Sequence, residues 1–148
     1  MKKIVVFSVV VVATLTLSGC GDSVKSVEEY SKLEKAELGK MLKECENKFE
    51  KIFDSPEAWE GKGEAAELEG ISQKIYKSRG GEEKHPSKDY FGFVGYGLVT
   101  DDELKKFGNS RYAELVECGR IQIAEKGGME VINKPRKSIA EKYKNVGK

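Results

Sequence analysis

Apolar residues recur at every third or fourth position between Val27 and Phe53, with Lys and Glu between them, as one face of an amphipathic helix requires. The pattern predicts a helix over this range whose charged face is exposed to solvent. Asp54-Ser55-Pro56-Glu57 then predicts a tight corner between two helices, because Ser or Asp caps a helix and Pro suits its first turn. The apolar positions are Val27, Tyr30, Leu38, Met41, Leu42, Cys45, Phe49, Ile52 and Phe53.

A second helical stripe follows the corner and ends near Lys77. Its apolar positions are Ala65, Leu68, Ile71, Ile75 and Tyr76. Trp59, the single tryptophan, lies directly after the corner, where an amphipathic ring favours core packing over the alternative of a recognition anchor. The polar stretch 79–89 predicts a loop, since it contains Gly80-Gly81 and His85-Pro86.

Residues 90–99 combine aromatic and β-branched side chains with three glycines. The side chains favour a short strand or an extended loop packed on the helices, and the glycines indicate bulges or close backbone approach. A flexible aromatic surface for a partner is the alternative interpretation.

The last third of the chain begins with a capping box in which Thr100 and Glu103 bond reciprocally at a helix start. A further helix is expected from Ser110 to Cys118. Beyond Gly119, alternating residues at 120–123 and 129–131 predict a small hairpin around Lys126-Gly127-Gly128, and a last short helix follows 133–135. The predicted fold is mainly α, a small helical domain with a minor β element, and α+β is the alternative.

The amino terminus has the features of an export signal. Lys2 and Lys3 precede the 14 uncharged residues 4–17, a stretch shorter than the roughly 20 needed to cross a bilayer and typical of a signal peptide. Leu17-Ser18-Gly19-Cys20 resembles a bacterial lipobox. The resemblance implies cleavage after Gly19, a diacylglycerol on the Cys20 thiol and a further acyl chain, such as palmitate, on the new amino group.

The chain therefore divides into a signal peptide at 1–19, a lipidated tether at 20–25 and a single small soluble domain at 26–148. The alternative is an ordinary secretory signal that ends in cysteine by chance. The lipid on Cys20 would hold the domain to a membrane of the cell envelope, facing the periplasm or the exterior. Gly21 is not the acidic residue that enteric bacteria use for inner-membrane retention, which favours the outer membrane.

Composition narrows the function classes. Without residues 1–19 the chain keeps 24 basic and 25 acidic side chains, so it lacks the basic excess of a nucleic-acid-binding domain. Cys45 and Cys118 remain as an even pair in an oxidising compartment, which favours a structural disulfide over two separate buried thiols. A metal or redox pair is disfavoured because the chain has no Cys-x-x-Cys motif and no histidine near either cysteine.

The chain offers few residues for catalytic chemistry. The single histidine, His85, precedes Pro86 in a charged loop, so neither a catalytic triad nor a four-ligand zinc site is expected. Asp101-Asp102-Glu103 occupies a first helical turn, where the helix dipole favours negative charge. We expect a non-catalytic protein that uses no cofactor and no metal, and that acts through contacts with a protein partner.

One short pattern carries a family resemblance. Ser26-Val27-Glu28-Glu29-Tyr30, Glu37-Leu38, Leu42 and Cys45-Glu46-Asn47 resemble the opening of the EexN family of small lipoproteins, related to TrbK-type entry exclusion proteins. The resemblance spans residues 26–47. It implies a role in blocking transfer of a related plasmid into a cell that already holds one, by contact with the incoming mating apparatus.

A structural or assembly lipoprotein that binds peptidoglycan or an envelope complex is the alternative function. It is indicated by a basic carboxyl end that would suit acidic polymer or lipid head groups. This end contains Lys134, Arg136, Lys137, Lys142, Lys144 and Lys148 against Glu141.

Overall fold

The structure, a computed structural model, describes residues 24–82, 84–88 and 92–133. In these residues the chain forms helices and no strand longer than an isolated bridge, so the predicted mainly α fold is confirmed. The helices are α1 (Val27–Tyr30), α2 (Lys35–Phe53), α3 (Pro56–Trp59), α4 (Gly63–Ser78), α5 (Val94–Gly97), α6 (Asp101–Phe107) and α7 (Ser110–Glu125).

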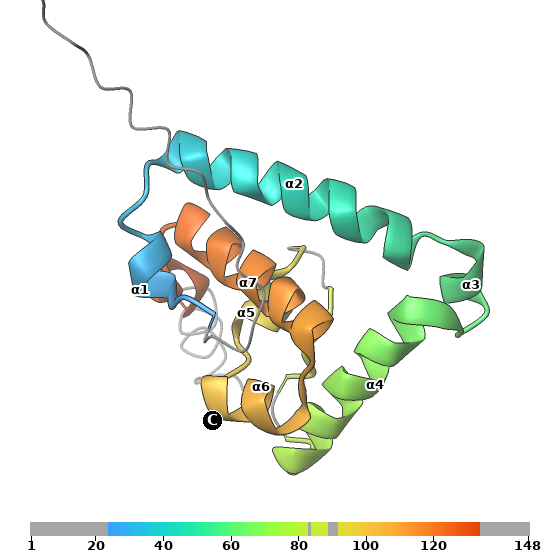
Figure 1. Ribbon diagram of the computed structural model, residues 1–148. Helices are drawn as coiled ribbons and strands as arrows, with labels where there is room; N and C mark the ends of the chain where they lie inside the picture. The colour runs from blue at the N-terminus through green and yellow to red at the C-terminus, as the bar shows by residue number, and fades with distance from the viewer. Residues whose placement is uncertain (1–23, 83, 89–91, 134–148) are drawn as a thin grey trace, which may run out of the picture.

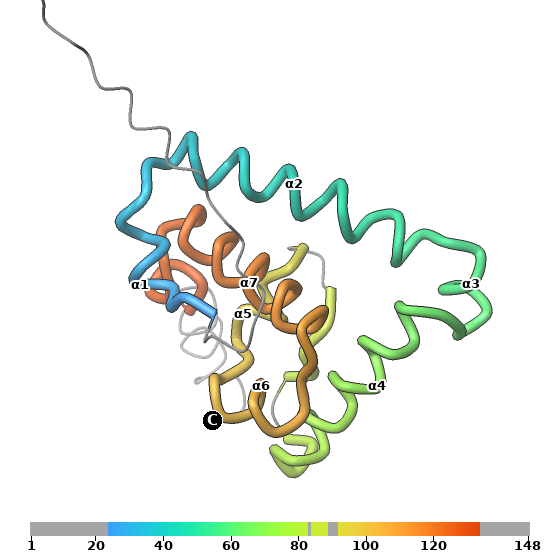
Figure 2. Tube along the Cα trace, viewed as in Figure 1, coloured from blue at the N-terminus to red at the C-terminus, as the bar shows by residue number. Residues whose placement is uncertain are grey.

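Helix α7 lies at the centre of the fold and packs against α1, α2, α4 and α5 (Figure 1). The path of the chain in Figure 2 shows α2 crossing from α1 to α3, after which α4 returns towards α6. One core cluster surrounds Phe49, Ile75 and Tyr112, and a second joins Tyr30 to Ile121. Because α7 contributes to both clusters, it connects the two halves of the described core.

The single helix predicted between Val27 and Phe53 is wrong, because the chain leaves the helix after Tyr30 and re-enters it at Lys35. The first piece, α1, is fixed by a capping box in which Ser26 and Glu29 bond each other's backbone N–H at 2.7 and 3.2 Å. The break allows both Tyr30 and Leu38 to bury their side chains in one cluster with α7. Packing on α7 therefore overrides the continuous helical spacing of the sequence.

The strand expected within 90–99 is also wrong, since residues 94–97 form the helical turn α5. A Cβ on Gly97 would lie 2.4 Å from the carbonyl carbon of Gly119, and a Cβ on Gly119 would lie 2.1 Å from the Gly97 nitrogen. These glycines thus permit close approach of α5 and α7. Phe93 and Tyr96 are buried in the core, which contradicts the alternative of an aromatic partner surface for these two residues.

The hairpin predicted beyond Gly119 is replaced by the second half of α7, which continues to Glu125. This half is buried on nearly all sides by α1, α2 and α5, so its sequence lacks a solvent-facing period and resembles a strand. Gly127 and Gly128 have φ of 107° and 95° and end the helix, and helical residues resume at 129–133. The short helix predicted after residue 133 lies outside the described residues.

Two predicted caps are confirmed. The Thr100–Glu103 capping box begins α6, and Ser55 caps α3 by accepting from the Ala58 N–H at 3.1 Å. Core packing of Trp59 is wrong, because its side chain is 81 % exposed at the end of α3. The corner between α2 and α4 therefore places this indole in solvent.

Candidate functional site

The amino-terminal end of the described chain is the candidate functional site, because the predicted lipid attachment at Cys20 lies just before it, outside the described residues. The description begins at Val24, where Arg120 Nη1 donates to the carbonyl oxygens of Val24 and Lys25 at 3.0 and 3.2 Å. Its Nη2 donates to the Val99 carbonyl at 2.8 Å and to Asp101 Oδ1 at 2.9 Å. We call these five residues the Arg120 cluster.

Arg120 is 6 % exposed, and burial of a guanidinium is unfavourable unless its N–H groups are bonded. Three carbonyls and one carboxylate supply the acceptors, and the bond to Asp101 is charge-assisted. The cluster joins the first described residues to α7 and to the link between α5 and α6. The start of the domain is thereby fixed in position.

Only residues 21–23 separate Cys20 from the Arg120 cluster. Four residue steps span at most about 14 Å in a fully extended chain. A lipid on Cys20 would therefore hold the surface around Val24 close to the head groups of the membrane.

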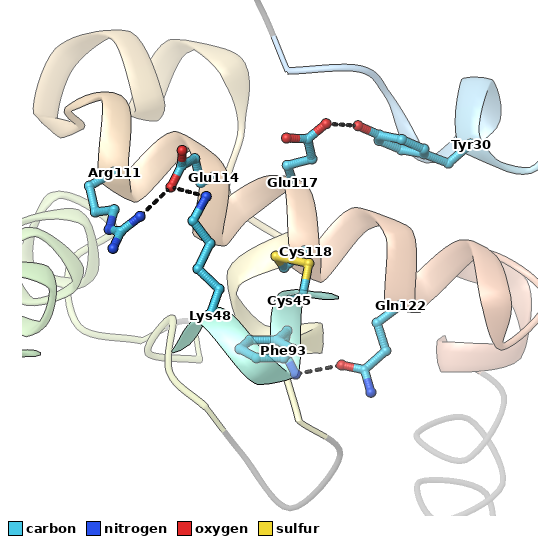
Figure 3. The surroundings of a disulfide bond; sticks show 9 residues. All are labelled: Tyr30, Cys45, Lys48, Phe93, Arg111, Glu114, Glu117, Cys118 and Gln122. Carbon is cyan, nitrogen blue, oxygen red and sulfur yellow. Dashed lines mark hydrogen bonds and ion pairs between the residues drawn. A yellow bond between two sulfur atoms is a disulfide. The ribbon is translucent and has the colours of Figure 1, made fainter. Parts of the chain in front are cut away.

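A second contact fastens the same end of the molecule. The Tyr30 hydroxyl donates to Glu117 Oε1, which joins α1 to α7 (Figure 3). Burial raises the pKa of Tyr30, and the hydrogen bond to Glu117 raises it further. The phenol therefore stays protonated and remains a donor at every pH at which the domain would act.

The two cysteines of the predicted pair lie together between α2 and α7 (Figure 3). Their sulfur atoms are 2.07 Å apart in a disulfide, with Cα atoms 5.9 Å apart. One turn away on α7, Glu114 Oε2 accepts from Lys48 Nζ at 2.9 Å and from Arg111 Nη1 at 2.8 Å. The Lys48–Glu114 ion pair and the disulfide connect the same two helices.

The acidic run at the start of α6 has structural partners. Glu103 receives two hydrogen bonds from Arg79, at 2.6 and 2.7 Å, and a third from the Thr100 N–H. The bonds from Arg79 are the main reason that the pKa of Glu103 lies below its usual range. Since Asp101 bonds Arg120, two of the three acids in this run join helices and loops to one another.

The remaining candidate residues do not converge on a reactive group in the described part of the chain. The half-buried His85 has its Nε2 at 3.3 Å from Glu69 Oε1, but the pair lacks hydrogen-bond geometry. No three His, Cys, Asp or Glu side chains among the described residues lie together as metal ligands do. The basic end at 134–148 lies outside the described residues.

Arg120 is the residue of this candidate site that the sequence did not predict, because its segment was expected to be a strand. The available signal was the single basic residue between Arg111 and Lys126, which lies close to the apolar residues Val116, Ile121 and Ile123. In a buried segment such a charge requires fixed partners. Those partners come from distant parts of the chain, so the sequence alone could not name them.

Comparisons of the chain with protein-family models, with curated proteins and with solved structures found no match. Among the described helices, none combines the length and the apolar character needed to cross a membrane. The arrangement of residues around Arg120 at the amino-terminal end of the described chain is thus the observation on which a functional proposal is based.

Proposed function

We propose that this protein is an exported bacterial lipoprotein, held to an envelope membrane by lipid on Cys20, that acts through protein contacts and not through catalysis. The observation that carries the proposal is the lipobox at residues 17–20, followed after three residues by the Arg120 cluster. A lipid anchor only three residues before a fixed first segment of the domain would hold that domain at the membrane in a defined orientation. The outer membrane is the favoured location, because Gly21 is not the acidic residue that enteric bacteria use for inner-membrane retention.

We propose further that the protein contacts are of the entry exclusion kind, from the resemblance of residues 26–47. Within that pattern, Tyr30, Leu38 and Cys45 are buried and serve the core. The residues free to meet a mating apparatus are therefore the exposed ones of the same segment of α2. They are Lys35, Ala36, Glu37, Gly39, Lys40, Lys43, Glu44, Glu46 and Asn47.

Metabolic labelling with a fatty acid tests the anchor. The wild-type protein should carry label and remain with membranes after a high-salt wash, whereas Cys20→Ala should be unlabelled and should retain residues 1–19. Cys45→Ala is the matched control, and it should be labelled and processed like the wild type. Label on Cys20→Ala, or a mature wild-type protein that is unlabelled and washes off membranes, would contradict the proposal.

A mating assay tests the entry exclusion role. Recipient cells that produce the wild-type protein should receive the mobile element that encodes it less often than recipients producing Cys20→Ala. An unrelated conjugative plasmid is the control, and its transfer should be unchanged. Equal transfer into both recipients, or a gene located away from any conjugative element, would remove this role and leave the lipoprotein proposal intact.

A further inference from the structure

Trp59 is the most exposed large apolar side chain in the described part of the protein, at 81 %. The next is Val131 at 42 %, while the aromatic residues Tyr30, Phe49 and Tyr112 are buried. Tryptophan is enriched among the residues that dominate binding energy in protein interfaces. Because these aromatic side chains are buried and Trp59 is exposed to solvent, the exposed indole indicates an interaction surface.

The backbone beneath Trp59 is ordered by local bonds. Ser55 Oγ accepts from the Ala58 N–H at 3.1 Å and donates to the Ile52 carbonyl at 3.0 Å, and Pro56 occupies the first turn of α3. The Lys62 N–H then donates to the Glu57 carbonyl at 2.8 Å. Residues 54–64, which we call the α3 corner, therefore present the indole from a defined backbone, and a partner would not have to order it.

The α3 corner is strongly acidic. Within residues 54–64 the sequence has four acidic residues and one basic residue, Lys62. Glu60 pairs with Lys62 at 3.1 Å and Glu64 pairs with Arg111. Asp54 and Glu57 are exposed and form no ion pair with any described residue, so two unpaired negative charges lie five and two positions before Trp59.

The α3 corner also lies far from the amino-terminal end of the described chain. Helix α2, 19 residues and therefore about 28 Å long, separates α3 from α1 and the Arg120 cluster (Figure 1). A domain anchored beside Val24 would thus hold Trp59 at its opposite end. This position suits contact with another molecule rather than with the lipids around the anchor.

We infer that the α3 corner is a docking surface for a basic segment of another protein, in which an Arg or Lys side chain stacks on Trp59 and its neighbours pair with Asp54 and Glu57. A cation over an indole face is the most favourable cation–π arrangement. The surrounding carboxylates supply charge complementarity, and they disfavour an anionic membrane surface as the occupant. The inference depends on the proposed function only for the compartment of the partner.

Fluorescence of the single tryptophan provides a direct test with the purified full-length lipoprotein in a non-ionic detergent. A capped peptide of alternating Arg and Gly should change Trp59 emission saturably, and added salt should weaken the effect. The double variant Asp54→Lys/Glu57→Lys should raise the Kd by about tenfold or more, as the loss of two charge partners beside a cation–π contact predicts. Glu82→Lys/Glu130→Lys, at exposed acids outside the corner, should leave the Kd unchanged.

Photo-crosslinking in the native envelope tests the biological partner. A benzoylphenylalanine residue in place of the exposed Glu60, which leaves Trp59 intact, should form an adduct whose partner peptide contains Arg or Lys, and Asp54→Lys/Glu57→Lys should abolish that adduct. Circular dichroism of each variant ensures that a loss of binding is not a loss of folding.

Several outcomes would overturn the inference. In the fluorescence assay, they are an equal change of Trp59 emission with a peptide of Glu and Gly, or a change with lipid vesicles but not with the basic peptide. In the crosslinking assay, they are an adduct with lipid or with a second copy of this chain, or an adduct that still forms in Asp54→Lys/Glu57→Lys. Because the fluorescence assay does not depend on Cys20, it can fail while fatty-acid labelling succeeds. A failure of the docking surface is therefore distinguishable from a failure of the anchor.

Discussion

Arg120 shows how much of the amino-terminal end of the described chain depends on one side chain. Its guanidinium bonds two carbonyls at the start of the described chain, one carbonyl before α6 and one carboxylate within α6. These segments are separated by up to 96 positions in sequence. Their relative placement at this end of the described chain is therefore set by a single buried cation.

Arg120→Ala should reduce the free energy of unfolding by about 3 kcal/mol, because it leaves buried carbonyls without donors. Arg120→Lys should cost less, since an ammonium keeps the charge but cannot reproduce the planar set of donors. Urea unfolding followed by circular dichroism measures both effects, and hydrogen exchange at residues 24–26 should accelerate. Arg111→Ala, which removes a more exposed guanidinium, is the control, and an equal loss in Arg120→Ala and Arg111→Ala would refute the role of the Arg120 cluster.

At the scale of elements, the contact between α5 and α7 explains why glycine occurs twice in segments with otherwise bulky residues. Gly97 and Gly119 face each other so closely that neither position has room for a Cβ. The close approach also brings Tyr96 of α5 against Tyr112 of α7, with ring centroids 6.1 Å apart. A short helical turn of four residues is thereby packed firmly against the central helix.

Gly97→Ala or Gly119→Ala should destabilise the protein by about 1–3 kcal/mol, because the added methyl group must push the two backbones apart. Gly39→Ala and Gly70→Ala are matched controls within α2 and α4, where a Cβ would meet nothing within 4 Å. Each control should stabilise its helix by about 0.5–1 kcal/mol, the usual advantage of Ala over Gly. Thermal unfolding of the four variants gives the comparison, and equal shifts at all four positions would be inconsistent with this packing.

At the scale of the whole molecule, the disulfide between Cys45 and Cys118 closes a loop of 73 residues. The loop contains all of α3, α4, α5 and α6, so the bond limits the unfolded state across most of the described chain. Both cysteines are also buried between α2 and α7, where the pair belongs to the larger core cluster. Covalent closure and core packing therefore act on the same interface.

The double variant Cys45→Ala/Cys118→Ala should lose about 4 kcal/mol of unfolding free energy, the loop-closure entropy expected for this length. Reducing agent should lower the stability of the wild type to a similar extent and leave the double variant unchanged. Urea unfolding with and without dithiothreitol measures both responses. A wild-type midpoint that does not respond to dithiothreitol would show that the two thiols are not joined in solution.

The sequence by itself determined the elements that local interactions specify. Helices α2 and α4 follow from amphipathic spacing, because each keeps one face in solvent and one in the core. The Ser55 cap and the Thr100–Glu103 capping box follow from residues three positions apart, which bond within one turn. The pairing of Cys45 with Cys118 was likewise indicated by the number of cysteines and by the oxidising compartment that the amino terminus predicts, without knowledge of the fold.

The tertiary structure alone decided the break after Tyr30, the helical state of α5 and the second half of α7. Residues buried on several sides carry no solvent-facing period, so their spacing does not distinguish a helix from a strand. The partners of Arg120, the contact between Gly97 and Gly119 and the exposure of Trp59 have the same origin. Each depends on whether a segment distant in sequence packs against that residue, and the neighbouring residues in the sequence do not determine which segment that is.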